Sequence, residues 1–153
     1  MSKLTVGQKR SYSRHRDAMA EFGYDLWFSM SGAHWLNDST LVWFPNLTQS
    51  KEDIARRGFG NYINGEFYIV EVAADERRLA RILRSMDARR IAFPRKKGED
   101  YKFGGLYKYD RTDKSKLSVF WKRIATEIDT DDYPAEPRGR KTPCKQTERR
   151  IGK

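Results

Sequence analysis

Alternating apolar and polar residues predict a β-hairpin near the middle of the chain. Two runs of strand-forming residues, 61–63 and 66–72, flank the dipeptide Asn64-Gly65, which favours a tight hairpin turn. Glu71 interrupts an otherwise apolar face of the second run. A carboxylate there indicates either an edge-strand charge that opposes aggregation or a buried functional group, and the edge-strand interpretation is the simpler one.

Apolar residues spaced three and four positions apart predict helices elsewhere. Short helices are predicted over 14–22 and 50–57, and Ser50 is the expected N-cap of the second. A final helix is predicted over 114–128. The clearest pattern covers 75–89, where one apolar stripe contains Leu79, Ile82, Leu83 and Met86.

Runs rich in β-branched and aromatic residues complete the predicted fold. Besides the hairpin, they predict strands over 24–30, 40–44, 91–93 and 103–109. Together these patterns predict an α+β fold. We expect a mainly antiparallel sheet of about five strands with the two main helices packed on one face.

Length and composition indicate one folded domain between two flexible ends. At 153 residues the chain can form one core, and eight Phe, eight Tyr and four Trp supply large side chains to bury. We expect a basic N-terminal arm over 1–13 and a single α+β domain over 14–128. A basic, Pro-containing C-terminal tail is expected over 129–153.

Positive charge is concentrated at the two ends of the chain. The formal net charge is +10, of which residues 1–16 carry +5 and residues 137–153 carry +6, so the residues between them sum to −1. A neutral body with two cationic ends is typical of proteins that bind a polyanion. We therefore expect a nucleic-acid partner, DNA or RNA, bound through its phosphates with little sequence specificity.

Basic residues in four parts of the chain are the candidates for phosphate contacts. Arginine suits this role because its planar fork can donate two hydrogen bonds to one phosphate. On the helix predicted over 75–89, the arginines lie away from the apolar stripe, although Asp75, Glu76 and Asp87 offer them ordinary ion pairs. The candidate set comprises Lys9, Arg10, Arg14, Arg16, Arg77, Arg78, Arg81, Arg84, Arg95, Lys96, Lys97, Arg138, Arg140 and Lys141.

Two other classes of function stay open. A small metal-dependent nuclease would use converging carboxylates to hold Mg²⁺, and the candidates are Glu66, Glu71 and Asp100, with Lys102 in an Asp-x-Lys spacing. Alternatively, an inhibitor or assembly factor would dock its basic ends on an acidic protein. Nucleic-acid binding itself requires no catalytic step, and it suits a small protein of a phage or other mobile element.

Cysteine and histidine are scarce. The single cysteine, Cys144, cannot form an internal disulfide, and with only His15 and His34 the chain predicts no zinc site and no bound cofactor. No apolar run approaches the ~20 residues of a membrane span, and the first residues have no signal-peptide pattern. We therefore expect a cytoplasmic protein without a membrane partner. No segment resembles a known family over enough of the chain to name one.

Overall fold

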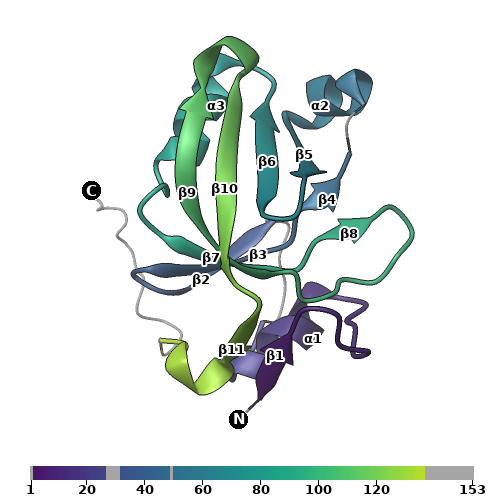
Figure 1. Cartoon of the computed structure of the whole chain (residues 1–153), viewed down its shortest axis with the longest axis vertical. Coiled ribbons are helices and arrows are strands. Elements are labelled where there is room, and N and C mark those ends of the chain that lie inside the picture. The colour runs from purple at the N-terminus through teal and green to yellow at the C-terminus, as the bar shows by residue number, and fades with distance from the viewer. Residues whose placement is uncertain (1, 27–31, 49, 137–153) are drawn as a thin grey trace.

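A large mixed β-sheet with three short helices forms the body of the molecule (Figure 1). The computed structural model describes residues 2–26, 32–48 and 50–136. Nine strands pair in the order β2-β3-β7-β9-β10-β6-β5-β4-β8. Their bounds are β2 Ala33–Asn37, β3 Thr40–Trp43, β4 Asn46–Leu47, β5 Phe59–Asn64, β6 Tyr68–Ala73, β7 Arg89–Ala92, β8 Arg95–Lys96, β9 Gly105–Asp113 and β10 Ser118–Ala125.

The remaining elements are short. β1 (Lys3–Thr5) and β11 (Glu127–Asp129) pair as a separate two-stranded sheet. The other elements are the α-helices α1 His15–Met19, α2 Lys51–Arg57 and α3 Glu76–Leu83, and the 3₁₀ helices η1 Ala20–Phe22, η2 Lys114–Lys116 and η3 Thr130–Asp132. The predicted α+β class is confirmed, but the sheet is larger than five strands and contains parallel pairs.

Several local predictions are confirmed. The hairpin forms from β5 and β6, although Asn64 pairs with Tyr68, so the turn is one residue longer than a two-residue loop. At the start of α2, Ser50 Oγ accepts a hydrogen bond from the Asp53 amide at 3.2 Å. The helix ends at Gly58, whose φ of +93° is one that glycine tolerates best.

The predicted helix over 114–128 is wrong. Apart from the short turn η2 and the start of β11, this segment forms β10, which lies between β9 and β6. Val119 and Trp121 are buried, whereas Lys122 is exposed, so the apolar residues follow the alternation of a strand. In a short segment rich in aromatic and β-branched residues, helical and strand spacings share positions, and pairing with two neighbouring strands decides the outcome. The strand predicted over 24–30 lies mostly outside the described residues.

Two Phe-Pro corners join the ends of the large sheet. β3 and β7 run parallel, and each leads through Phe44-Pro45 or Phe93-Pro94 into the parallel pair β4 and β8. Backbone hydrogen bonds continue across the corner, from the Phe93 amide to Trp43 O at 2.8 Å and from the Arg95 amide to Pro45 O at 3.1 Å. β3 and β7 lie near one end of the strand order, and β4 and β8 form its other end. Because the two corners join these ends, the sheet closes on itself.

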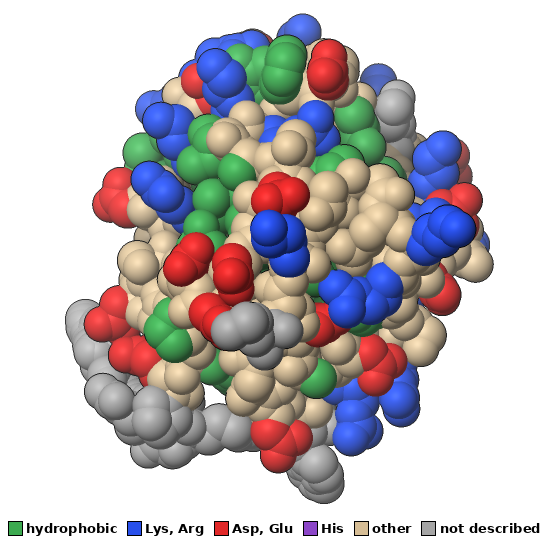
Figure 2. Space-filling model, turned by 60° about the horizontal axis from the view of Figure 1, so that its bottom comes forward, with side chains coloured by type: hydrophobic (Ala, Val, Ile, Leu, Met, Phe, Trp, Pro, Cys, Tyr) green, Lys and Arg blue, Asp and Glu red, His purple; other side chains and the backbone are tan. Residues whose placement is uncertain are grey.

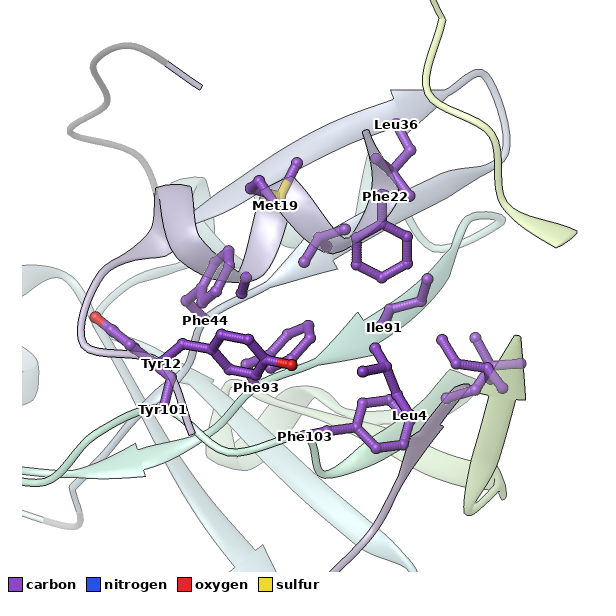
Figure 3. Packing of buried hydrophobic residues seen from close by; sticks show 14 of the residues in the cluster. Leu4, Tyr12, Met19, Phe22, Leu36, Phe44, Ile91, Phe93, Tyr101 and Phe103 are labelled. Atoms are coloured by element: carbon purple, nitrogen blue, oxygen red, sulfur yellow. The ribbon is translucent and has the colours of Figure 1, made fainter. Parts of the chain in front are cut away.

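The core contains two clusters of buried side chains. In the first, Phe44 stacks on Phe93 with ring centroids 5.5 Å apart, and residues of α1 and β1 cover them (Figure 3). The second lies under α3 and is centred on Trp121, which is fully buried. Among the described residues, no helix is long and apolar enough to cross a membrane.

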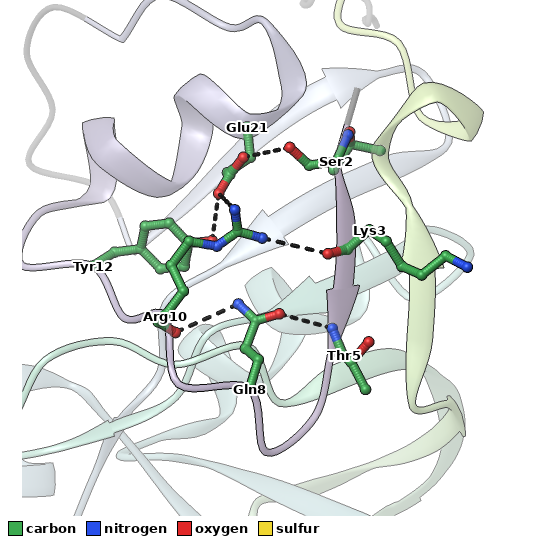
Figure 4. Close-up of polar contacts among 8 residues, drawn as sticks. Ser2, Lys3, Thr5, Gln8, Arg10, Tyr12 and Glu21 are labelled. Carbon is green, nitrogen blue, oxygen red and sulfur yellow. Dashed lines mark hydrogen bonds and ion pairs between the residues drawn. The ribbon is translucent and has the colours of Figure 1, made fainter.

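The N-terminal residues are part of the folded body. Leu4 on β1 is completely buried, and Glu21 accepts bonds from Ser2 Oγ at 2.7 Å and from the Tyr12 hydroxyl at 2.6 Å (Figure 4). Arg10 forms an ion pair with the same carboxylate at 3.2 Å. Burial first, and then the bond to Glu21, raise the pKa of Tyr12 to about 12. The expected flexible N-terminal arm is therefore wrong for these residues, while 137–153 lie outside the described residues.

Removing the Glu21 carboxylate should loosen this N-terminal attachment. We expect Glu21→Ala to lower the free energy of unfolding by roughly 2–3 kcal/mol, because hydrogen bonds to a charged group contribute about that much. Urea denaturation measures the change. Glu66→Ala, at an exposed turn position, is the control and should change stability by less than about 0.5 kcal/mol. Equal effects of the two substitutions would contradict the role of Glu21.

A pair of histidines beside the first cluster, His34 buried and His15 half-buried, makes stability depend on pH. His15 Nδ1 lies 3.1 Å from His34 Nε2, and its Nε2 lies 3.0 Å from the Tyr101 hydroxyl. Burial, and then the neighbouring His34 and Arg95, lower the pKa of His15 to about 4, and burial also lowers the pKa of His34. His15 therefore stays neutral in the folded protein above about pH 4, whereas in the unfolded chain it binds a proton below about pH 6.5.

Stability should fall as the pH drops from about 6.5 towards 4, because protons then bind the unfolded state preferentially. We expect the urea midpoint of the wild-type protein to fall more between pH 7 and pH 5 than that of His15→Phe, which keeps a ring against Phe44. Parallel decreases in the two proteins would show that His15 does not supply this pH dependence.

Candidate functional site

A pocket of about 790 Å³ opens between α3 and the strands around β3. Its walls come from six strands, from α2 and α3, and from the corner that follows β3, so the closure of the sheet builds it. Trp43 and Phe59 give it apolar surface, and the half-exposed side chain of Trp35 stands at its edge. Phe44 also lines the pocket, and its ring stacks on His15 at 4.0 Å, which supports the wall from behind.

Two asparagine side chains lie on one wall of the pocket. Asn61 Oδ1 is buried and has no hydrogen-bond partner among the described residues, while its Nδ2 lies 3.4 Å from Asn46 O. The side-chain oxygen of Asn46 accepts a bond from Arg95 Nε at 2.9 Å. A buried acceptor without a partner costs free energy, so this wall is suited to a ligand that donates a hydrogen bond.

A buried ion pair forms another part of the pocket lining. Arg90 Nη1 donates to Glu71 Oε1 at 3.0 Å, and Trp121 Nε1 donates to the same oxygen at 3.1 Å. The guanidinium lies 3.7 Å from the ring centroid of Trp121 and 4.6 Å from that of Trp43. Burial lowers the pKa of Arg90, and Glu71 acts in the opposite direction by favouring its charged form.

Three arginines that line the pocket are available to an anionic ligand. Arg57 is the last residue of α2, Arg81 lies on α3, and Arg84 directly follows α3. None of them has an ion-pair partner among the residues that the structure describes. By contrast, Arg56 pairs with Asp53 and Arg78 pairs with Asp75.

Comparison with known proteins identifies the family. The family model of the SRA domain, the SET and RING associated domain, matches residues 7–130. The chain belongs to the SRA family. No curated protein matches it.

One solved structure extends the comparison. The SRA domain described here is similar to the 5-hydroxymethylcytosine-specific restriction enzyme AbaSI, with a TM-score of 0.68 and 26% sequence identity. The match covers 88% of this chain but only 44% of AbaSI, so the SRA domain spans less than half of that enzyme.

The structure separates the basic residues predicted to contact phosphates. Arg81 and Arg84 lie at the pocket, whereas Arg77 is exposed on α3 and Arg78 is paired. At the N-terminus, Arg10 is paired with Glu21 and Arg14 with Asp17. Lys9, Arg16, Lys96 and Lys97 are exposed, Arg95 contacts Asn46, and Arg138, Arg140 and Lys141 lie outside the described residues.

Cations and carboxylates are interspersed at the end of the SRA domain where β1 and β11 lie (Figure 2). Besides the pairs already described, Lys3 lies 3.5 Å from Glu127. The N-terminal cations therefore have carboxylates of the domain as neighbours. The charge pattern of the sequence does not by itself locate a binding surface, because it does not show these pairs.

The carboxylates proposed for a nuclease do not form a metal site. Glu66 is exposed in the β5–β6 turn, Asp100 accepts a bond from Ser11 at 3.2 Å, and Lys102 is exposed. Glu71 is buried against Arg90, and β6 lies between β10 and β5, so the edge-strand interpretation of Glu71 is wrong. The described residues contain no group of three or more His, Cys, Asp or Glu that could hold a metal ion.

Sequence reasoning missed Asn46, Asn61 and Arg57. In the structure Asn61 pairs with Glu71 across the β5–β6 ladder, so the two side chains share a face. The predicted two-residue turn would place Asn61 opposite Tyr68 instead, so this polar pair depends on the longer turn and is not visible in the sequence. Asn46 follows Pro45 closely, and nothing local in the sequence distinguishes it from a turn residue.

Breaking the buried ion pair should be costly. We expect Glu71→Leu to lower the free energy of unfolding by about 3–5 kcal/mol, because it leaves the Arg90 cation buried without its partner. Equilibrium urea denaturation measures the loss. The double substitution Glu71→Leu/Arg90→Met removes both charges and should recover much of it. A double variant no more stable than Glu71→Leu alone would contradict this account.

Proposed function

We propose that this chain binds duplex DNA and holds a single modified cytosine in the pocket. Family membership and the likeness to AbaSI, a 5-hydroxymethylcytosine-specific enzyme, support DNA as the partner and modified cytosine as the base. Because the match covers 44% of AbaSI, restriction is not carried over with it. The observation on which the proposal rests most is the unpaired Asn61 Oδ1 in an aromatic-walled pocket.

The pocket fits a base better than it fits a backbone group. Cytosine has two flat faces, which aromatic side chains contact well, and an exocyclic amine that can donate to Asn61 Oδ1. A base stacked in a duplex cannot enter a cavity, so it must be turned out of the helix, and proteins that act on single bases use this route. The pocket volume of about 790 Å³ leaves room for a substituent on the ring.

Phosphate contacts supply the remaining affinity. Arg57, Arg81 and Arg84 lie at the pocket without ion-pair partners among the described residues, so they can bind the backbone on either side of the extruded nucleotide. Such contacts are independent of sequence and weaken as salt increases. We therefore propose recognition of one modified base with little preference for the surrounding sequence.

Fluorescence anisotropy with three duplexes tests the pocket. The duplexes differ only in one base, which is cytosine, 5-methylcytosine or 5-hydroxymethylcytosine. We expect tighter binding to a modified duplex, and Asn61→Ala should weaken that binding by about tenfold or more, because Asn61 Oδ1 meets the exocyclic amine of the base. A duplex with thymine at this position lacks the amine, so its binding should change little. Equal affinity of the wild-type protein for all three duplexes would exclude the proposed function.

The arginines are tested with the same probes at several salt concentrations. Arg81→Gln should weaken binding of every duplex alike and reduce the slope of log K against log salt by about 1. Arg56→Gln is the matched control, because Arg56 is paired with Asp53 on α2. Equal losses in Arg56→Gln and Arg81→Gln would place the phosphate contacts elsewhere.

A further inference from the structure

Arg95 lies beside the pocket amides because of strand pairing. In the parallel ladder of β4 and β8, Asn46 and Arg95 occupy the same register position, and Leu47 of β4 pairs with Asn61 of β5. The guanidinium of Arg95 also lies 4.3 Å from the ring centroid of Tyr101, which is 4% exposed. Arg95 is therefore held by a strand neighbour and by a buried ring.

Hydrogen bonding determines which end of each amide is available to a ligand. Arginine only donates, so the atom of Asn46 that lies 2.9 Å from Arg95 Nε must be the oxygen. A backbone carbonyl only accepts, so the atom of Asn61 that faces Asn46 O must be the nitrogen. Among the described residues, neither Asn46 Nδ2 nor Asn61 Oδ1 has a hydrogen-bond partner, so this wall of the pocket holds one unpaired donor and one unpaired acceptor.

This pair of groups discriminates between pyrimidines. Cytosine presents an amine donor at position 4 beside a ring-nitrogen acceptor at position 3, whereas uracil presents an acceptor and then a donor. With Asn61 Oδ1 opposite position 4 and Asn46 Nδ2 opposite position 3, cytosine makes both bonds. A uracil ring in the same place meets acceptor with acceptor and donor with donor, which leaves buried polar groups unpaired.

We infer that Arg95 is a positioning residue that makes the pocket selective for cytosine-type bases over uracil-type bases by fixing the orientation of the Asn46 amide. This inference rests on the proposed function. Without the Nε donor, the Asn46 amide can rotate by half a turn and present its oxygen in nearly the same volume. The mismatch of uracil at position 3 would then be removed, while Asn61 Oδ1 would still oppose the oxygen at position 4. Selectivity would therefore fall in part, while the fold and the phosphate contacts stayed.

The test compares 5-hydroxymethylcytosine with 5-hydroxymethyluracil at one position, each opposite an abasic site, so that base-pairing strength does not differ between the two duplexes. The wild-type protein should prefer the cytosine form by about tenfold or more. In Arg95→Met we expect this ratio to fall below about threefold, with the salt dependence unchanged. Lys96→Met, at the exposed next position on β8, is the control and should keep the ratio.

A phosphate-binding role for Arg95 makes a different prediction. If Arg95→Met weakens both duplexes equally and reduces the salt slope by about 1, Arg95 contacts phosphate and the inference is overturned. An unchanged ratio with unchanged affinity overturns it as well. Arg95→Lys keeps the charge but lacks the Nε donor, so it should also lose selectivity, and it serves where Arg95→Met does not fold.

The two proposals fail in distinguishable ways. If the wild-type protein binds 5-hydroxymethylcytosine no better than cytosine in the paired duplexes, the proposed function fails. If it prefers the modified duplex and Arg95→Met retains the full preference for the cytosine form over the uracil form, only the role of Arg95 fails.

Discussion

The parallel ladder that crosses the two Phe-Pro corners is the constraint on which the structure depends. It joins β3 to β7 before the corner and β4 to β8 after it, so that the sheet closes. Proline suits these positions because it fixes φ and needs no amide partner at the point where the ladder turns. The same corner places Phe44 between the pocket and the histidine pair and sets Asn46 beside Arg95.

Charge burial is the second theme of the pocket. The opposite charges of Glu71 and Arg90 neutralise each other in apolar surroundings, and two tryptophan rings flank the guanidinium. Such a pair contributes little net stability compared with apolar residues of the same size. The position of this ion pair beside the pocket agrees with a role in shaping the pocket lining, because the Glu71 carboxylate holds the Trp121 indole N–H in one geometry.

Local signals in the sequence were sufficient for part of the fold. The Asn-Gly turn located the β5–β6 hairpin, and Ser50 with Gly58 bounded α2. The segment of β10 has apolar spacing that also fits a helix. Its pairing with β9 and β6 makes it a strand, and the local sequence does not show this pairing. The site was harder still, because Arg90 pairs with Glu71 and Arg95 with Asn46 across separations of 19 and 49 residues. The N-terminal cations were likewise expected to be unpaired, but Arg10 forms an ion pair with Glu21.

The pairing of β1 with β11 has a consequence for how the fold can be combined with other modules. The Thr130 amide donates to Ser2 O at 2.8 Å, so the first and last described elements lie side by side. A domain whose first and last elements adjoin can be inserted into a surface loop of another protein without distorting that loop. This geometry is therefore compatible with a place between two other domains as well as with a place at the end of a polypeptide.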